Sequence, residues 1–122
     1  MARLSTVAGD AHGPVTSSVA VHDARLALVI LAVEDLPRSI AFYRAVLGWT
    51  QPVDTPVYAE LASPNGMRLG LYDRRSFGIN IGQVPAPIAG PVATTEIYLY
   101  ADDLEAVLAR ARDAGATVLS PA

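Results

Sequence analysis

The passage from residue 29 to residue 49 restricts the fold more than any other part of the chain. Residues 29–33 form an apolar run that is rich in β-branched side chains and too short to cross a membrane, which predicts a buried strand. Asp35 can cap the N-terminus of a helix, and Pro37 is tolerated in a helix only within its first turn. Gly48 suits a left-handed C-terminal cap. We therefore expect a strand that leads directly into one helix.

The apolar residues of this helix recur at helical spacing and predict a single buried face. They are Leu36, Ile40, Phe42, Tyr43, Val46 and Leu47. A helix with one apolar face packs against another apolar surface, and a sheet is expected to supply it.

Residues 57–62 and 67–72 are predicted to pair as a hairpin across the turn sequence at 63–66, Ser-Pro-Asn-Gly. Alternation gives this hairpin two different faces. One face is apolar and suits burial under the helix: Val57, Ala59, Leu61, Met67, Leu69 and Leu71. The opposite face must meet water or a ligand: Tyr58, Glu60, Arg68, Gly70 and Tyr72.

The last part of the chain repeats the strand-to-helix passage. Aligning Asp35 with Asp103 also places Ile40 on Leu108, so the sequence resembles a tandem duplication. Residues 75–92, rich in Gly, Pro and Ala, are interpreted as the linker between the two halves.

The second helix is predicted to begin at one of two adjacent aspartates. We favour Asp102 over Asp103 as its cap, because Glu105 lies three residues after Asp102 and would complete a capping box. Gly115 is expected to end this helix. Its apolar stripe consists of Leu104, Val107, Leu108 and Ala111.

Composition limits the possible function classes. The 122 residues suffice for one domain, and 52% hydrophobic with 17% charged residues indicates a folded globule. A net charge of -3 with nine scattered basic residues argues against nucleic-acid binding. The absence of Cys suits a cytoplasmic protein, and no apolar run is long enough for a membrane span.

Residues 1–24 have two interpretations. They form either a flexible N-terminal arm or an extra edge strand, the latter predicted over residues 15–21 by alternation of Val and polar residues. His12 and His22 lie in this segment without a third ligand at metal-binding spacing, so we interpret them as solvated.

The motif V-x-D-L followed by S-x-x-F-Y-R-x-V-L-G-W, at residues 33–49, resembles the first half-module of the vicinal oxygen chelate superfamily. That superfamily includes glyoxalase I, bleomycin- and fosfomycin-resistance proteins and extradiol dioxygenases. The residues that carry the resemblance are Asp35, Phe42, Tyr43, Leu47 and Gly48, and the likeness covers residues 26–122.

The resemblance implies an α+β fold of paired βαβββ modules whose sheets form a cup. Module one would be residues 26–74 and module two residues 93–122, within a single domain at 25–122. Module two is expected to lack its last strands, and the N-terminal arm or a second subunit is expected to close its sheet. We therefore expect a homodimer.

The resemblance also defines where metal ligands would stand. The family's ligand positions correspond here to Leu28 on the first strand, Gly70 on the fourth and Glu96 on the equivalent strand of module two. One oxygen ligand does not hold a divalent ion tightly, so we expect no metal or other cofactor. A divalent metal remains the alternative if a partner chain or a further tail supplies ligands.

Alternation along the strands gives the predicted lining of the cup. We expect these residues to bind a ligand: Leu28, Tyr58, Glu60, Arg68, Tyr72, Tyr98 and Tyr100. Glu96 is the candidate catalytic carboxylate, either as a ligand-orienting group or as a general base. The alternative for Glu96 is structural, as a partner of Arg68 or a solvated side chain.

Three functional hypotheses follow. The first is a metal-free module, similar to bleomycin-resistance proteins, that binds a small apolar or aromatic molecule in the cup. The second is a metal-dependent lyase, isomerase or dioxygenase of the same superfamily. The third is a structural half-cup that dimerises and binds no ligand.

Overall fold

The computed structural model describes residues 23–84 and 95–117, together with the backbone of residues 3–5. Its larger sheet has four strands in the order β2-β5-β4-β3. These are β2 (Leu28–Val33), β3 (Thr50–Asp54), β4 (Tyr58–Ala62) and β5 (Arg68–Asp73). Strand β2 runs parallel to β5, whereas β4 is antiparallel to both β3 and β5.

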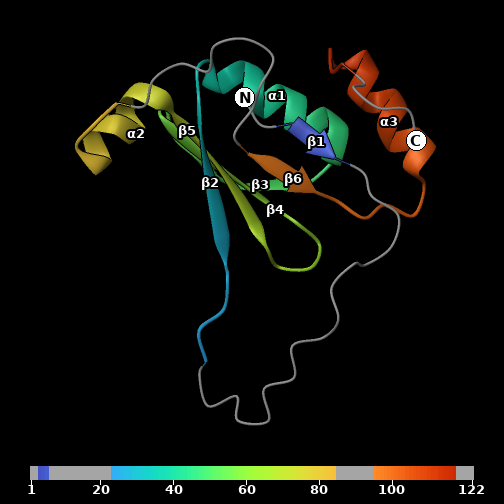
Figure 1. The fold of residues 1–122 in the computed structure, drawn as a ribbon, viewed down its shortest axis with the longest axis horizontal. Coiled ribbons are helices and arrows are strands. Elements are labelled where there is room, and N and C mark those ends of the chain that lie inside the picture. Colours follow the sequence, from blue (N-terminus) through green and yellow to red (C-terminus); the bar gives the residue numbers. More distant parts are fainter. Residues whose placement is uncertain (1–2, 6–22, 85–94, 118–122) are drawn as a thin grey trace.

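Helix α1 (Leu36–Leu47) follows β2 and lies along the sheet, as Figure 1 shows. Its two predicted caps are confirmed. Asp35 Oδ1 accepts a hydrogen bond from the Arg38 backbone N–H at 3.1 Å, and Gly48 takes a left-handed conformation at φ 67°. Pro37 lies in the first turn, where its missing N–H leaves no helical hydrogen bond unmade.

The core forms between α1 and one face of the sheet. Leu61, Leu71 and Val46 are the largest fully buried side chains, and Leu36 and Tyr43 of α1 are each 5% exposed. Burying one Leu side chain contributes about 1.5–3 kcal/mol, so this face supplies much of the stability. Burial also raises the pKa of Tyr43 to about 12, because the phenolate would lose its hydration.

Residues 74–81 correct the prediction of a linker that begins at residue 75. They form helix α2 (Arg74–Ile81), which Asp73 caps by accepting a hydrogen bond from the Ser76 N–H at 3.0 Å. Gly78, which by composition suggests a loop, has a packing role. A Cβ at this position would lie 2.4 Å from Val84 Cα, so only glycine allows the chain to pass.

The second half contains strand β6 (Glu96–Tyr98) and helix α3 (Leu104–Asp113). Arg110 Nε of α3 donates a hydrogen bond to the Val46 carbonyl of α1 at 3.2 Å, which joins the two helices. Ala111 is the buried member of the predicted apolar stripe, and Gly115, at φ 100°, follows the end of the helix.

The predicted cap of α3 is wrong by one residue. Asp103, and not Asp102, is the N-cap, and its Oδ1 accepts from the Ala106 N–H at 3.1 Å. This bond is equivalent to the one that Asp35 makes to Arg38. The internal repeat was therefore a better guide than the capping-box spacing to Glu105.

A short strand from the N-terminal segment joins the second half. Strand β1 (Arg3–Ser5) pairs in parallel with β6, and the two form a separate sheet. The strand predicted at residues 15–21 lies outside the described residues. No helix in the described ranges has the length and apolar character that crossing a membrane requires.

The cap assignment generates a stability prediction. Asp103→Ala should lower the free energy of unfolding by about 1 kcal/mol, and Asp35→Ala by a similar amount, because each removes the acceptor of one exposed helix N–H. Asp102→Ala is the matched control and should change it by less than about 0.5 kcal/mol. Urea denaturation measures all three, and a larger loss for Asp102→Ala than for Asp103→Ala would contradict the assignment.

Candidate ligand-binding face

Although Val57, predicted for its buried face, is 40% exposed, the β4–β5 hairpin has one polar and partly exposed face, as its alternation predicts. Its register places Tyr58 opposite Tyr72, Glu60 opposite Gly70 and Ala62 opposite Arg68. The intervening residues Ala59, Leu61, Leu69 and Leu71 are buried on the other face. We call the set Tyr58, Glu60, Arg68, Gly70 and Tyr72 the tyrosine face.

Glu60 is the centre of a hydrogen-bond network on this face. Its Oε2 accepts from the Tyr58 hydroxyl at 2.6 Å, and its Oε1 accepts from Arg68 Nη1 at 2.8 Å. The Glu60 side chain is 14% exposed and that of Arg68 is 43% exposed. The carboxylate is thus partly screened from water, while the guanidinium remains accessible.

The network shifts the ionisation of two of its members. The Arg68 hydrogen bond, followed by the Tyr58 hydrogen bond, holds the pKa of Glu60 below its ordinary value. Desolvation and the hydrogen bond to Glu60 raise the pKa of the Tyr58 hydroxyl. At neutral pH the face therefore carries an ionised Glu60 beside a neutral Tyr58.

Aromatic rings continue from the network toward α2. The ring centroids of Tyr58 and Tyr72 are 4.9 Å apart, and those of Tyr72 and Phe77 are 5.8 Å apart in an edge-to-face arrangement. Phe77 is absent from the predicted site because its segment was interpreted as a linker. The capping signal at Asp73, with Ser76 three residues later, could have revealed the helix that carries it.

Gly70 allows the Tyr58 ring to lie close over the sheet. A Cβ at this position would lie 2.7 Å from the Tyr58 hydroxyl oxygen and 2.9 Å from Ile30 Cγ1. Real Cβ atoms do not approach so closely, so any larger residue would displace one of these side chains. On the adjoining strand, Leu28 is half-buried and in register with Arg68.

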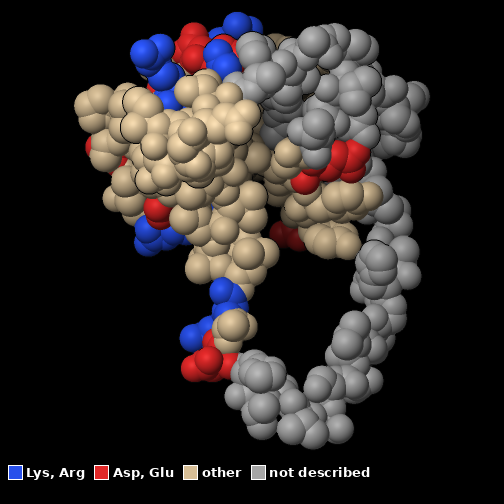
Figure 2. Space-filling view, turned by 60° about the vertical axis from the view of Figure 1, so that its left-hand side comes forward, with Lys and Arg blue, Asp and Glu red and all other residues tan. Residues whose placement is uncertain are grey.

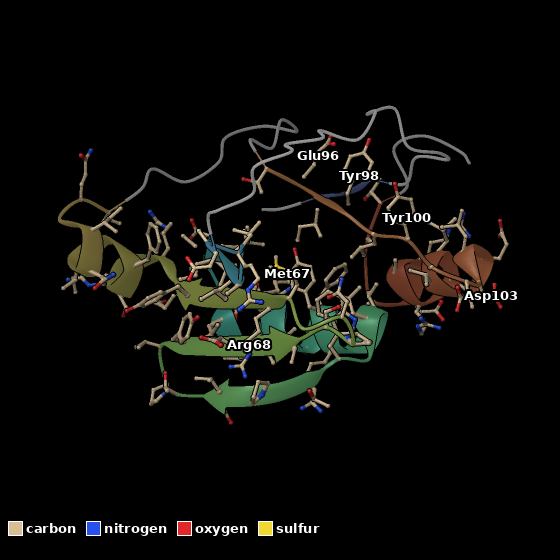
Figure 3. The ribbon with its side chains drawn as sticks, turned by 90° about the horizontal axis from the view of Figure 1, so that it is seen from below. Met67, Arg68, Glu96, Tyr98, Tyr100 and Asp103 are labelled. Atoms are coloured by element: carbon tan, nitrogen blue, oxygen red, sulfur yellow. The ribbon has the colours of Figure 1, made fainter. Side chains whose placement is uncertain are left out.

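The predicted residues of the second half lie apart from this network. Figure 3 shows Arg68 on the four-stranded sheet and Glu96, Tyr98 and Tyr100 along the β6 segment. Glu96 and Tyr98 are exposed, and Tyr100 is 77% exposed. The alternative in which Glu96 pairs with Arg68 is wrong, because the carboxylate that pairs with Arg68 is that of Glu60.

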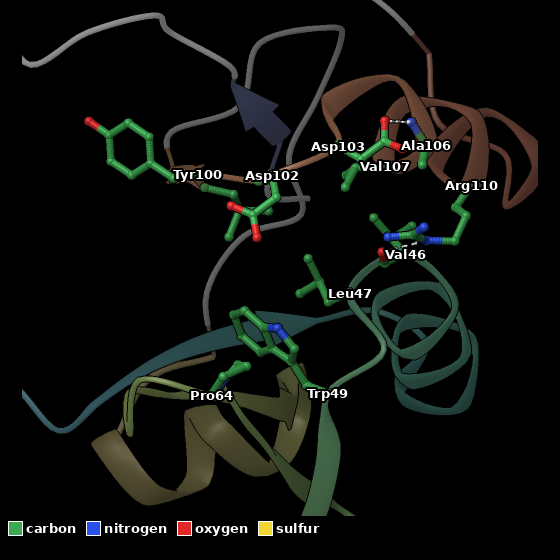
Figure 4. A pocket seen from close by; sticks show the side chains of 12 residues that line it. Val46, Leu47, Trp49, Pro64, Tyr100, Asp102, Asp103, Ala106, Val107 and Arg110 are labelled. Carbon is green, nitrogen blue, oxygen red and sulfur yellow. Dashed lines mark hydrogen bonds between the residues drawn. The ribbon is translucent and has the colours of Figure 1, made fainter.

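A pocket of about 380 Å³ lies elsewhere, between the end of α1, the β4–β5 turn and α3 (Figure 4). Trp49, Pro64 and Val107 contribute apolar walls, and Asp102 and Arg110 contribute charges. Of the predicted site residues, Tyr100 alone lines it. Sequence alternation cannot reveal such a pocket, because residues distant in the chain form it.

The described side chains do not fit a metal centre. Within residues 23–84 and 95–117, no three His, Cys, Asp or Glu side chains gather closely enough to hold an ion. His12 and His22 lie outside these ranges.

On the face shown in Figure 2, basic and acidic side chains form small separate groups, and no continuous basic stripe crosses its described part.

Solved structures share this fold. A glyoxalase/bleomycin resistance protein/dioxygenase from Nocardioides is 25% identical with a TM-score of 0.62, and the match covers 84% of this chain and 70% of that one. A glyoxalase/bleomycin resistance protein/dioxygenase family enzyme from Burkholderia phytofirmans PsJN is 19% identical with a TM-score of 0.61, covering 75% and 74%. A glyoxalase-related enzyme from Fulvimarina pelagi is 22% identical, with a TM-score of 0.58 and coverage of 75% and 65%.

The sequence itself matches a family model. No curated protein is similar enough to this chain to count as a relative. The model of the glyoxalase-like domain, however, matches residues 28–122, which is well over half of the sequence. The strand-to-helix motif at residues 33–49 falls inside this match, and the resemblance to the vicinal oxygen chelate superfamily is confirmed. The chain therefore belongs to the glyoxalase-like domain family.

Proposed function

We propose that this protein binds a small apolar or aromatic molecule on the tyrosine face. The observation that carries the proposal is the convergence of Tyr58 and Arg68 on Glu60, at 2.6 and 2.8 Å, beside the Tyr72 ring. Aromatic faces bind planar apolar groups, and a few fixed polar groups orient them.

The network supports binding because it orders its side chains before a ligand arrives. Two donors hold the Glu60 carboxylate, and the carboxylate in turn holds the Tyr58 ring and the Arg68 guanidinium. Side chains that are already ordered lose less conformational entropy on binding. The hydrogen bond to Glu60 occupies one of the five guanidinium N–H donors of Arg68, and other donors can contact a ligand oxygen.

The same network is better suited to holding a ligand than to transferring protons. Glu60 has a lowered pKa and Tyr58 a raised one, so neither changes its protonation near neutral pH. We propose Glu96, on β6, as a catalytic carboxylate only for a ligand bound beside β6, because Glu96 lies apart from the tyrosine face. Within the described ranges, no observation favours the metal-dependent alternative.

The names of the structural neighbours agree with this proposal. Two of them are called glyoxalase/bleomycin resistance protein/dioxygenase, names that all refer to action on, or resistance to, small molecules. The homodimer and the cytoplasmic location stay predictions.

A ligand screen tests the proposal. We expect a library of small aromatic compounds, screened by ligand-observed NMR, to yield compounds that bind the wild type. Arg68→Ala and Tyr72→Ala should each weaken their binding about tenfold, which corresponds to the loss of about 1.4 kcal/mol of contacts.

Arg38→Ala is the matched control, because Arg38 is an exposed arginine on α1, away from the tyrosine face. Its affinities should equal those of the wild type. A library without any binding compound, or compounds that bind Arg68→Ala and Tyr72→Ala as tightly as the wild type, would overturn the proposal.

Stability should depend on pH through Glu60. Its folded-state pKa lies below the ordinary 4.5, so the ionised carboxylate stabilises the fold above about pH 4.5, and this contribution is lost as the pH falls through the lowered pKa. Arg68 is largely exposed, so the contribution should be about 1 kcal/mol or less. The difference in unfolding free energy between wild type and Glu60→Gln should therefore shrink in acid. Urea denaturation at several pH values measures it, and a difference independent of pH would contradict the network.

A further inference from the structure

We propose that β1 is the closing strand of the second half of this fold. β1 pairs with β6 as β5 pairs with β2. Residues 3–5 are therefore an integral part of the second half of the fold.

The first half shows what a closed half requires. Strand β2 leads into α1 and pairs in parallel with β5, from Leu28 opposite Arg68 to Val33 opposite Asp73. β5 is the second strand of the β4–β5 hairpin. Among the described strands, it is the one neighbour of β2 in the sheet. A parallel partner thus satisfies the hydrogen-bonding groups along one edge of β2.

The second half repeats this arrangement with a different partner. The alignment of Asp35 with Asp103 also places Leu28 on Glu96 and Leu36 on Leu104, the first residues of the equivalent strands and helices. The partner of β6 is β1, also in parallel, from Arg3 opposite Glu96 to Ser5 opposite Tyr98. Both ladders therefore begin at the equivalent residue and run in the same direction.

β1 comes from a part of the chain that the family match does not cover. The family match begins at residue 28, so residues 3–5 lie outside it. Within the described ranges, no strand follows α3. A segment from outside the matched region thus occupies the position of a strand that the described part of the matched region does not contain.

A physical requirement explains why β6 needs this partner. Ile97 is half-buried and packs against the main hydrophobic core, which holds β6 against the body of the protein. Unpaired backbone groups at such a position cost free energy, and a strand edge also invites pairing with other chains. β1 satisfies one edge of β6 and so fixes the strand that carries Glu96 and Tyr98.

Cross-linking tests the pairing directly, because the chain has no cysteine of its own. In Ser5→Cys/Tyr98→Cys, the two cysteines occupy register partners on adjacent strands of one sheet. Dibromobimane bridges two neighbouring thiols and becomes fluorescent when both have reacted. We expect rapid bridging within one chain, with a single-chain mass on a denaturing gel.

The control is Ser5→Cys/Asp54→Cys, because Asp54 is an exposed residue at the end of β3, an edge strand of the other sheet. It should bridge at least tenfold more slowly. Equal bridging of the two variants, no bridging of the Ser5–Tyr98 pair, or bridging only between chains would overturn the proposal.

A deletion provides an independent measurement. Removing residues 2–5 should lower the Tm by about 4 °C or more, because the partner of β6 is lost. Removing Ala2 alone leaves β1 intact and should leave the Tm unchanged. If the variant without residues 2–5 has the same Tm as the wild type, β1 does not have a closing role. Neither experiment involves a ligand, so both are independent of the proposed function.

Discussion

Burial of one face of the β4–β5 hairpin under α1 is the interaction on which the rest of the structure depends. Leu61 and Leu71 are fully buried, and Ala59 and Leu69 lie beside them. Because side chains alternate along a strand, this burial forces Tyr58, Glu60, Arg68 and Tyr72 onto the opposite face. A register shift of one residue would reverse both faces and would bury Glu60 and Arg68 against the helix. The apolar core therefore also determines the composition of the candidate site.

The sequence permits prediction where one physical rule acts alone. The caps of α1 follow from Asp35 and Gly48, and the two faces of the hairpin follow from strict alternation. Prediction fails where two rules compete. The capping-box spacing to Glu105 favours Asp102, but the repeat geometry places the cap at Asp103. Gly78 suggests a loop by composition, yet close packing against Val84 explains its presence within α2.

Features that join distant parts of the chain are beyond sequence reasoning of this kind. Alternation places Glu60 and Arg68 on one face, but it does not show that Glu60 rather than Glu96 becomes the partner of Arg68. The contribution of Phe77 depends on how α2 packs against β5. Likewise, the N-terminal segment contains no signal that residues 3–5 pair with β6. In each case tertiary packing selects among partners that the local sequence permits equally.

The two halves of the fold use their common plan differently. Both place a strand before a helix that an aspartate caps with a 3.1 Å hydrogen bond. In the first half, a hairpin from the same half completes the sheet and supplies the tyrosine face. In the second half, an N-terminal strand provides the parallel partner. The candidate site thus belongs mainly to the half whose sheet is larger and whose side chains are linked by hydrogen bonds.

We propose that a ligand binds on the tyrosine face and not in the pocket beside Trp49. The most direct measurement is a map of backbone amide shifts in isotope-labelled protein on addition of the aromatic compound that binds most tightly. We expect the largest shifts in β4, β5 and α2, around Glu60, Tyr72 and Phe77. Largest shifts at Trp49 and at residues 99–107 would place the ligand in the other pocket and would contradict the claim.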